Sequence, residues 1–299
     1  MRALTRRAEF PLVISATSFG TLAVFGKLAY ADGVNVQTLL GFRFLLAGSV
    51  LLLVVVARRR PRPGRRTFLA LVALGSAGYV GQSAAYFNSL RFVPAAVTSI
   101  LLYTYPAIVT VASVRLYGAP MDRARAAAVV LALLGSALVA SPSGGLRWEG
   151  IVLGLLSAAV YSTYILAGKR VMARVDPVTA ITVIALSGGL TYMAFTLATH
   201  SLSPPHSARG WLAIVGLALI ATVVGGGGFL AGLRRTDPGR ASLISTLEPV
   251  STATLAFLIF GELLGPLQLV GGALVLAAVV MTARAPEKAL PAEPMALRD

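Results

Sequence analysis

Long apolar stretches, separated by short joins rich in proline, glycine and arginine, run through almost the whole chain. An α-helix needs about 20 apolar residues to cross roughly 30 Å of hydrocarbon. Ten stretches have about that length, at residues 11–29, 37–57, 67–90, 95–117, 123–140, 149–172, 177–199, 209–233, 240–260 and 266–283. Because most joins are shorter than ten residues, neighbouring helices are expected to be antiparallel.

Composition favours a membrane protein over a pair of water-soluble domains. Of the 299 residues, 57% are hydrophobic and 12% are charged, whereas a soluble globular protein has about 25% charged residues. The mean hydropathy is +0.81. The chain has no cysteine and only two histidines, both in one loop, so it lacks the ligands of a zinc site. No phosphate-binding loop and no Ser/His/Asp arrangement is found either, and we expect neither enzyme activity nor a cofactor.

Basic residues form short clusters between the apolar stretches, such as the six arginines within residues 58–66. The net charge of +15 therefore reflects membrane orientation rather than a nucleic-acid groove. With the N-terminus in the cytoplasm, 21 of the 26 lysines and arginines lie in inner segments and three in outer loops. The positive-inside rule thus predicts ten spans with both termini cytoplasmic, and residues 285–299 form a disordered cytoplasmic tail.

The first apolar stretch also resembles a cleavable signal peptide, because Arg6 and Arg7 precede it and Ala29-Tyr30-Ala31 follows it. The stretch is long for such a peptide and Lys27 interrupts its end. Since the internal repeat described next needs this helix, we expect it to remain as the first span.

The two halves of the chain are related by an internal repeat. Ser15, Ala16, Thr21, Gly26 and Lys27 match residues 142 positions later, and Leu90, Arg91, Ser99, Pro106 and Gly118 match residues 143 positions later. Each repeat, residues 1–142 and 143–284, contains five predicted spans. Because five is odd, the second repeat must enter the membrane inverted. Inverted repeats are typical of secondary transporters, with a substrate site between the repeats near the bilayer midplane.

Several motifs resemble the EamA-type module of the drug/metabolite transporter superfamily. They are Leu247-Glu248-Pro249-Val250, Phe260-Gly261-Glu262, Gly271-Gly272, Arg43-Phe44, Pro106 and Gly26-Lys27. Ala119 departs from the pattern, which has an acid there, as Glu262 is in the second repeat. The resemblance implies a metabolite exporter of the bacterial inner membrane, similar to exporters of aromatic amino acids. It also implies a central cavity lined by spans one, three, four, six, eight and nine, with spans five and ten behind them.

Polar and aromatic residues within the spans are the candidate substrate contacts. In the third span, Tyr79, Gln82, Ser83 and Tyr86 share one helix face, which is expected to point away from lipid. This face either lines the cavity or forms a seam between helices. The other candidates are Phe19, Ser99, Tyr103, Tyr161, Tyr164, Ser242, Thr246 and Glu248.

Two charges and two prolines complete the candidate set. A charge near the centre of a span costs about 3 kcal/mol, so Glu248 is either a proton-coupling or ammonium-binding site or a partner of Arg43. Arg43 has a structural role in this interpretation, or extends to the outer interface. Pro106 and Pro249 are at equivalent positions of the repeats, as gating hinges or as static kinks.

Together, these patterns predict an all-α membrane protein with ten transmembrane helices in two inverted five-helix repeats around a central cavity. We expect a monomer in the lipid bilayer that exports or exchanges small amphipathic metabolites, in particular aromatic or neutral amino acids, by alternating access. The alternatives are an exporter of drugs or of nucleotide-sugar or nucleoside metabolites, and a passive channel. Nucleic acid is not an expected partner.

Overall fold

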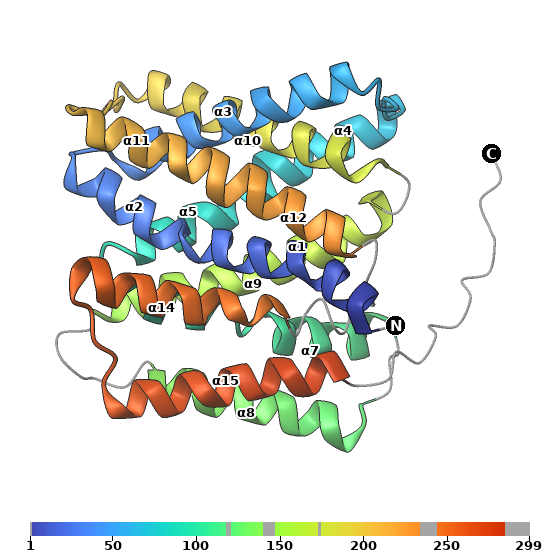
Figure 1. Ribbon diagram of the computed structural model, residues 1–299, viewed down its shortest axis with the longest axis vertical. Helices are drawn as coiled ribbons and strands as arrows, with labels where there is room; N and C mark the ends of the chain where they lie inside the picture. Colours follow the sequence, from blue (N-terminus) through green and yellow to red (C-terminus); the bar gives the residue numbers. More distant parts are fainter. Residues whose placement is uncertain (1, 118–120, 140–146, 173–174, 234–243, 285–299) are drawn as a thin grey trace.

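The computed structural model is helical throughout the residues that it describes, which are 2–117, 121–139, 147–172, 175–233 and 244–284. The helices lie side by side and the joins gather at two opposite ends (Figure 1). In the first half they are α1 (Arg2–Gly20), α2 (Leu22–Ala31), α3 (Val36–Ala57), α4 (Arg65–Ala73), the π-helix η1 (Leu74–Tyr79), α5 (Val80–Ser89), α6 (Ala95–Leu102), α7 (Tyr105–Tyr117) and α8 (Arg123–Val139). In the second half they are α9 (Trp148–Met172), α10 (Pro177–Ala198), α11 (Ala208–Gly216), the π-helix η2 (Leu217–Val224), α12 (Gly225–Leu233), α14 (Leu247–Phe260) and α15 (Pro266–Arg284).

Seven helical stretches within the described ranges are long and apolar enough to cross a membrane. They are Phe10–Ala31, Val36–Ala57, Arg65–Ser89, Ala95–Ala112, Trp148–Gly168, Pro177–Ala198 and Ala208–Phe229. Two shorter apolar helices are Leu247–Phe260 and Pro266–Met281. Each of the seven overlaps one predicted span, and the other three predicted spans overlap α8, α14 and α15.

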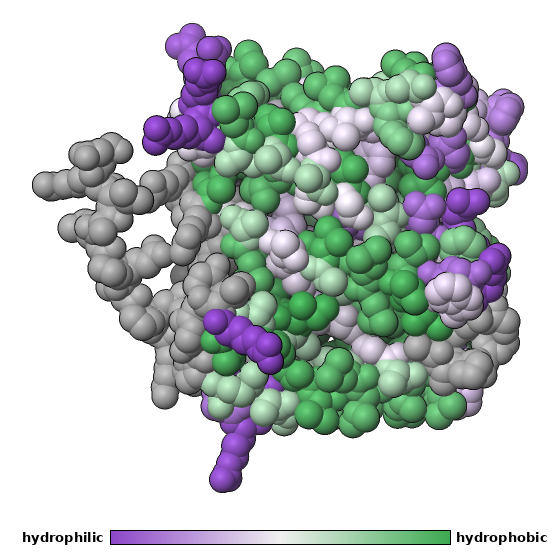
Figure 2. Space-filling view, turned by 180° about the vertical axis from the view of Figure 1, so that it is seen from behind, coloured by the Kyte–Doolittle hydropathy of each residue, from purple (hydrophilic) through white to green (hydrophobic). Residues whose placement is uncertain are grey.

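The surface of the helices is apolar where lipid would contact it. Leu53, Leu133 and Leu212 are 66–70% exposed although they are large hydrophobic residues. Figure 2 shows apolar side chains across the middle of one face, with hydrophilic residues near its two ends. Hydrocarbon offers no hydrogen-bond partner to the backbone, so only structures that satisfy it internally, such as helices, are stable there. The helical architecture and the apolar surface are therefore consequences of the same solvent.

The helices of the two halves repeat at nearly one offset along the chain. The segments α4–η1 and α11–η2 both begin with nine α-helical residues, and the π-helix starts at Leu74 in the first half and at Leu217 in the second. π-helices are rare, so their recurrence 143 residues apart is strong evidence for a structural repeat.

The contacts between the halves occur twice, because each half packs on the other with equivalent helices, as two halves related by a two-fold axis do. Helix α1 packs against α12 and α14, while α9 packs against α5, α6 and α7. The hydroxyl of Ser15 donates to the carbonyl oxygen of Gly225 at 2.7 Å. The hydroxyl of Ser157 donates to the carbonyl oxygen of Gln82 at 3.2 Å. Both pairs join positions that the repeat makes equivalent.

The two halves run in opposite directions. Helix α1 begins near the marked N-terminus, whereas α9, the first helix of the second half, begins at the opposite end of the molecule (Figure 1). The start of α1 and the end of α15 lie at the same end. An inverted repeat has this arrangement.

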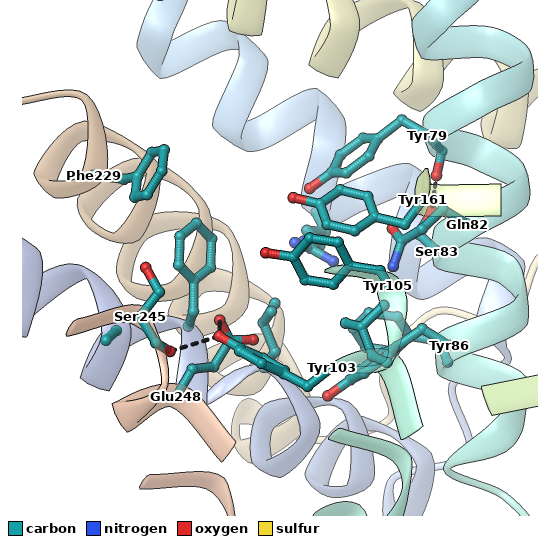
Figure 3. Close-up of a pocket in the computed structure, with 16 residues that line it drawn as sticks. Tyr79, Gln82, Ser83, Tyr86, Tyr103, Tyr105, Tyr161, Phe229, Ser245 and Glu248 are labelled. Atoms are coloured by element: carbon teal, nitrogen blue, oxygen red, sulfur yellow. Dashed lines mark hydrogen bonds between the residues drawn. The ribbon is translucent and has the colours of Figure 1, made fainter. Parts of the chain in front are cut away.

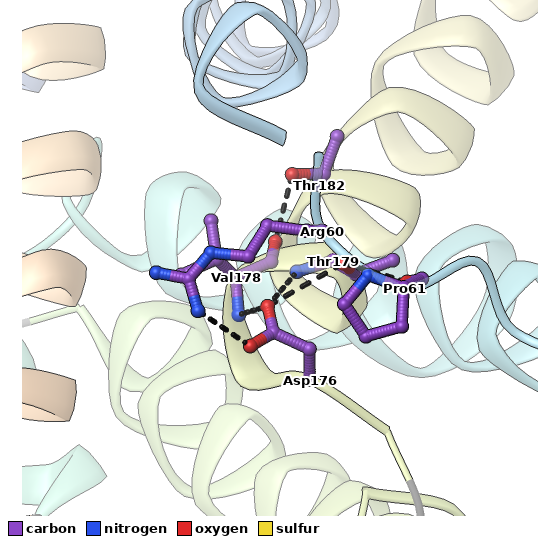
Figure 4. Close-up of polar contacts among 6 residues, drawn as sticks. All are labelled: Arg60, Pro61, Asp176, Val178, Thr179 and Thr182. Atoms are coloured by element: carbon purple, nitrogen blue, oxygen red, sulfur yellow. Dashed lines mark hydrogen bonds and ion pairs between the residues drawn. The ribbon is translucent and has the colours of Figure 1, made fainter. Parts of the chain in front are cut away.

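Helices α3 and α10 pack along their whole length and are tied together at both ends. At one end, Asp176 accepts hydrogen bonds from the backbone of Val178 and Thr179 at the start of α10, and it pairs with Arg60 at 3.0 Å (Figure 4). At the other end, Asn35 caps α3 and its amide donates to the carbonyl oxygen of Ser201. The two links are equivalent in the repeat, but only the first is an ion pair.

The join after α2 is held to the start of α11 at the same end as Asn35. The backbone N–H of Ser207 donates to Asp32 at 3.0 Å, and the ring nitrogen Nδ1 of His206 lies 3.0 Å from the carbonyl oxygen of Asp32. Hydrogen bonds from the side chain and backbone of Ser207 hold the pKa of Asp32 below its ordinary value. This carboxylate therefore stays ionised at neutral pH.

Helices α8 and α15 form a second closely packed pair at the edge of the molecule (Figure 1). A Cβ atom added at Gly271 would lie 2.6 Å from the carbonyl oxygen of Gly135, and one added at Gly135 would lie 2.6 Å from that of Gly271. The absence of side chains at these two positions is therefore what allows the backbones to approach.

We expect Gly271→Ala to lower the midpoint of thermal unfolding by several degrees. The methyl group would force two backbones apart, and overpacking of this kind costs about 1–3 kcal/mol. Gly227→Ala is the matched control, because no atom lies within 4 Å of the added Cβ. Thermal unfolding in detergent checks both variants, and equal midpoints would contradict the packing role of Gly271.

Candidate functional site

A cavity of about 200 Å³ lies in the interior, between helices of both halves (Figure 3). Its walls come from α1, α2, α3, η1, α5, α6, α7, α9, α12 and the start of α14, whereas α8 and α15 contribute no lining residue. The lining residues are Ala16, Phe19, Leu22, Arg43, Tyr79, Gln82, Ser83, Tyr86, Phe87, Leu102, Tyr103, Tyr105, Tyr161, Phe229, Ser245 and Glu248. Arg43 adds α3, the second predicted span, to the spans that the resemblance implied.

Most of the candidate residues from the sequence lie on this cavity. Those that line it are Phe19, Tyr79, Gln82, Ser83, Tyr86, Tyr103, Tyr161 and Glu248. Ser99 is buried in α6 away from the lining, Tyr164 packs behind Tyr161, and Thr246 lies beside the cavity without lining it. Ser242 is outside the described residues.

Tyr105, Phe229 and Ser245 line the cavity although they were not candidates from the sequence. The internal repeat indicates two of these residues, because each is 143 positions from a residue that was a candidate. Tyr105 lies 143 residues before Glu248, and Phe229 lies 143 residues after Tyr86. A candidate in one half therefore indicates its counterpart in the other.

A continuous group of tyrosine rings forms one wall. The rings of Tyr105 and Tyr161 meet edge to face with centroids 4.9 Å apart, and Tyr164 links Tyr161 to Tyr79 at centroid distances of 6.0 and 5.8 Å. In Figure 3 the hydroxyl groups of Tyr79, Tyr161 and Tyr105 point toward the side where Phe229 and Ser245 lie. The wall therefore offers hydroxyl groups together with aromatic surface.

The stripe on the third predicted span both lines the cavity and joins helices. The amide of Gln82 donates to the hydroxyl of Ser157 at 3.1 Å. The hydroxyl of Ser83 lies 3.2 Å from that of Tyr192 in α10. The two interpretations of the stripe are thus compatible, because Gln82 and Ser83 line the cavity and also bond to side chains of neighbouring helices.

Interruptions of the helices surround the cavity. Helix α1 ends at Gly20 and α2 begins at Leu22, and α6 and α7 are separated by Tyr103 and Thr104. Irregular backbone within a membrane is stable only where protein or cavity water satisfies it. Discontinuous helices of this kind are characteristic of transporter binding sites.

Pro106 and Pro249 lie in the first turn of α7 and of α14, directly after such interruptions. The two alternatives for these prolines, gating hinges and static kinks, stay predictions. A proline in the first turn leaves no hydrogen bond unmade, because that N–H would have no partner in the helix. Each proline therefore follows an interruption of the helix and does not itself lie inside an uninterrupted one.

Glu248 is held at the start of α14 by a tyrosine from the first half. The hydroxyl of Tyr103 lies 2.9 Å from Oε2 of Glu248 and 2.6 Å from the carbonyl oxygen of Ser245 (Figure 3). One side chain therefore connects the interruption between α6 and α7 to the carboxylate of the other repeat.

Arg43 is buried, with 2% of its surface exposed, so it does not extend to the interface. Its Nε donates to the hydroxyl of Thr222 in η2 at 3.0 Å, and its guanidinium carbon lies 4.8 Å and 5.4 Å from the ring centroids of Phe44 and Phe87. Within the described part of the chain, no ion pair joins Arg43 to Glu248. The expected alternative in which the two charges neutralise each other is therefore wrong for this conformation.

The whole architecture recurs in known proteins. The EamA-like transporter family matches the chain twice, over residues 6–141 and 148–284. The chain belongs to this family. It is thus a multi-pass membrane protein built from two EamA repeats.

Relatives of this EamA-like protein are similar along most of their length. An uncharacterized transporter of Archaeoglobus fulgidus is 28% identical over 93% of this chain and 97% of its own. The uncharacterized inner membrane transporter YedA of Escherichia coli is 24% identical, over 88% and 89%. A probable amino-acid metabolite efflux pump of Salmonella typhimurium is 25% identical, over 80% and 82%. A solved crystal structure that is 21% identical has a TM-score of 0.65 over 92% of this chain and 96% of its own, which shows the shared fold.

In this EamA-like protein, an ion pair joins the two halves at the end where α2 and α14 finish. Lys27 pairs with Glu262 instead of extending into solvent, and Glu262 also accepts the backbone N–H of Ala95 at 2.8 Å. Below this pair, Gly26 packs against the ring of Phe87, which is 1% exposed. Predicted spans one, three and four therefore meet the join after span nine at this end.

We expect the Lys27–Glu262 ion pair to stabilise the folded protein by about 1 kcal/mol, because its side chains are less exposed to solvent than those of a surface pair. In a double-mutant cycle, Lys27→Met and Glu262→Gln should each lower the unfolding free energy, and the double variant should lose less than their sum. Glutamine keeps an acceptor for the N–H of Ala95, so the cycle isolates the charge.

The control is Arg147→Gln, which breaks an ion pair to Glu149 whose arginine side chain is 58% exposed. This variant should change the unfolding free energy by less than about 0.5 kcal/mol. Strictly additive effects of the Lys27 and Glu262 variants would contradict a stabilising pair.

Proposed function

We propose that this EamA-like protein is a secondary transporter that exports or exchanges small amphipathic metabolites, in particular amino acids, by alternating access. The observation that carries the proposal is the cavity between two halves that run in opposite directions, lined by residues of both. A pseudo-two-fold axis in the membrane plane gives such a molecule two related conformations, each open to one side.

We propose ten spans, with α8, α14 and α15 completing the seven long apolar helices, and both termini in the cytoplasm. The common location of the start of α1 and the end of α15 supports an even number of crossings. The two modules would be residues 1–142 and 143–284. The name of the relative YedA supports the bacterial inner membrane as the location.

The size and lining of the cavity support an amino acid over the alternatives. About 200 Å³ is smaller than the roughly 300–1,000 Å³ of pockets that hold drug-sized ligands, so drugs and nucleotide sugars fit it less well. The name of the Salmonella typhimurium relative points to the same substrate class. The contacts of Glu262 with Lys27 and Ala95 join the two halves at one end, which favours a carrier over an open channel. Because one chain supplies both halves of the cavity, we propose a monomer.

Reconstituted liposomes test the proposal. We expect saturable counterflow of labelled L-phenylalanine or another neutral amino acid, because a carrier binds its substrate at one enclosed site. Protein-free liposomes give the background. Movement of a nucleoside or a cationic dye without any amino acid would contradict the substrate class, and single-channel currents would contradict a carrier.

We expect Ala16→Trp to abolish counterflow, because Ala16 is buried on the cavity wall and an indole would occupy the substrate volume. Ala277→Trp, which places the same group at an exposed position on α15, is the matched control and should keep counterflow within about two-fold. Size-exclusion profiles establish that both variants fold. Undiminished counterflow in a folded Ala16→Trp protein would contradict transport through this cavity.

A further inference from the structure

We propose that Arg43 and Glu248 are the two charge anchors of the substrate site, with Arg43 binding a carboxylate and Glu248 an ammonium group. The ligand class is therefore a small zwitterion with an aromatic or apolar side chain. This inference rests on the proposed function and assigns the two ends of the substrate to two residues.

The first observation is that the guanidinium of Arg43 has no ion-pair partner among the residues that the structure describes. The side chain lines the cavity, is 2% exposed and lies within a membrane span. Among the described residues, no carboxylate lies within 4.0 Å of it. An unpaired charge at such a depth is expensive, and the open side of Arg43 is the cavity. An anionic group of a ligand would supply the missing charge.

The second observation is that the guanidinium of Arg43 is positioned by one hydrogen bond and two aromatic rings. Thr222 fixes Nε at 3.0 Å, and the rings of Phe44 and Phe87 lie 4.8 Å and 5.4 Å from the guanidinium carbon. A planar guanidinium presents two parallel N–H groups to a carboxylate. Because these contacts position the guanidinium plane before a ligand arrives, binding a carboxylate costs less side-chain conformational entropy.

The third observation is that Glu248 lines the same cavity and is also held, by the hydroxyl of Tyr103 at 2.9 Å. Figure 3 shows Glu248 and Tyr103 on one side of the cavity, with the rings of Tyr105 and Tyr161 facing the same space. A carboxylate next to aromatic rings attracts an ammonium group both by charge and through the negative faces of the rings.

The combination of the two charges selects a zwitterion. A ligand with only an ammonium group leaves Arg43 unpaired, and a ligand with only a carboxylate leaves Glu248 unpaired. Leaving one buried charge without a partner is the main energetic penalty in such sites. A zwitterion satisfies both anchors at once, so each of its charged groups should contribute to affinity.

The test uses three probes that differ only in their charged groups: L-phenylalanine, phenethylamine, which lacks the carboxylate, and 3-phenylpropionate, which lacks the ammonium group. Binding to the purified full-length protein is measured as ligand-induced thermal stabilisation, and transport as counterflow in liposomes. Wild-type protein should bind L-phenylalanine at least 10-fold more tightly than either analogue. Equal affinities for the three probes would overturn the inference without requiring any variant to fold.

The variants assign the anchors. Arg43→Gln should weaken L-phenylalanine binding 10- to 100-fold and change phenethylamine binding less than about three-fold. Glu248→Gln should weaken L-phenylalanine to a similar extent and change 3-phenylpropionate less than about three-fold. Arg43→Lys should recover part of the loss, because it restores the charge without the planar fork. Arg60→Gln, which removes an arginine that does not line the cavity, should leave the order of the three affinities unchanged.

Two further outcomes have definite meanings. If Arg43→Gln weakens all three probes equally, Arg43 is structural and the inference is overturned. If wild-type protein binds the probes in the expected order but transports none of them, the proposed function fails while the assignment of the anchors is upheld.

Discussion

The inability of hydrocarbon to accept hydrogen bonds or charges determines most of this structure. The backbone responds by forming helices, and interruptions such as those at Thr21 and at Tyr103–Thr104 are located beside the cavity. The charges within the spans follow the same rule, because Arg43 and Glu248 both line the cavity. Because hydrocarbon excludes both, the irregular backbone and these two charged groups of the spans lie together at the cavity. The cavity is where the structure accommodates the irregular backbone and the charges that hydrocarbon excludes.

Helical periodicity and the repeat are enough to predict the architecture, because both depend on properties that the chain carries locally. The stripe of Tyr79, Gln82, Ser83 and Tyr86 was predicted to face inward, and all four residues line the cavity. The register of the repeat reappears in the starts of η1 and η2. Both predictions succeed because lipid forces one face of each helix to be apolar and the other to contain whatever is polar.

The details of the site depend on neighbours that periodicity does not describe. Tyr161 and Tyr164 are three residues apart on one helix face, yet Tyr161 lines the cavity while Tyr164 stacks behind it on Tyr79. Ser99 and Tyr103 are one helical turn apart, joined by a hydrogen bond from the backbone N–H of Tyr103 to the carbonyl oxygen of Ser99 at 3.2 Å, yet Tyr103 lines the cavity and Ser99 does not. The position of Arg43 near a helix end permitted an extended side chain. Its burial follows from Thr222, Phe44 and Phe87, which the chain brings there from three elements.

The repeat makes the two halves alike in backbone but not in side chains, and this difference has energetic consequences. Identical contacts at both ends would make closure at either end equally favourable. The link between α3 and α10 is an ion pair at one end, Arg60–Asp176, and an amide–carbonyl contact at the other. At the end where Glu262 lies, the carboxylate pairs with Lys27 and caps α6, whereas the repeat has Ala119 at the equivalent position. Because an alanine side chain carries neither a charge nor a hydrogen-bond acceptor, Ala119 cannot form the side-chain contacts that Glu262 forms. In the proposed alternating-access cycle, closure at the two ends would therefore differ in free energy, so the backbone symmetry of an inverted repeat does not by itself make its two conformations equally populated.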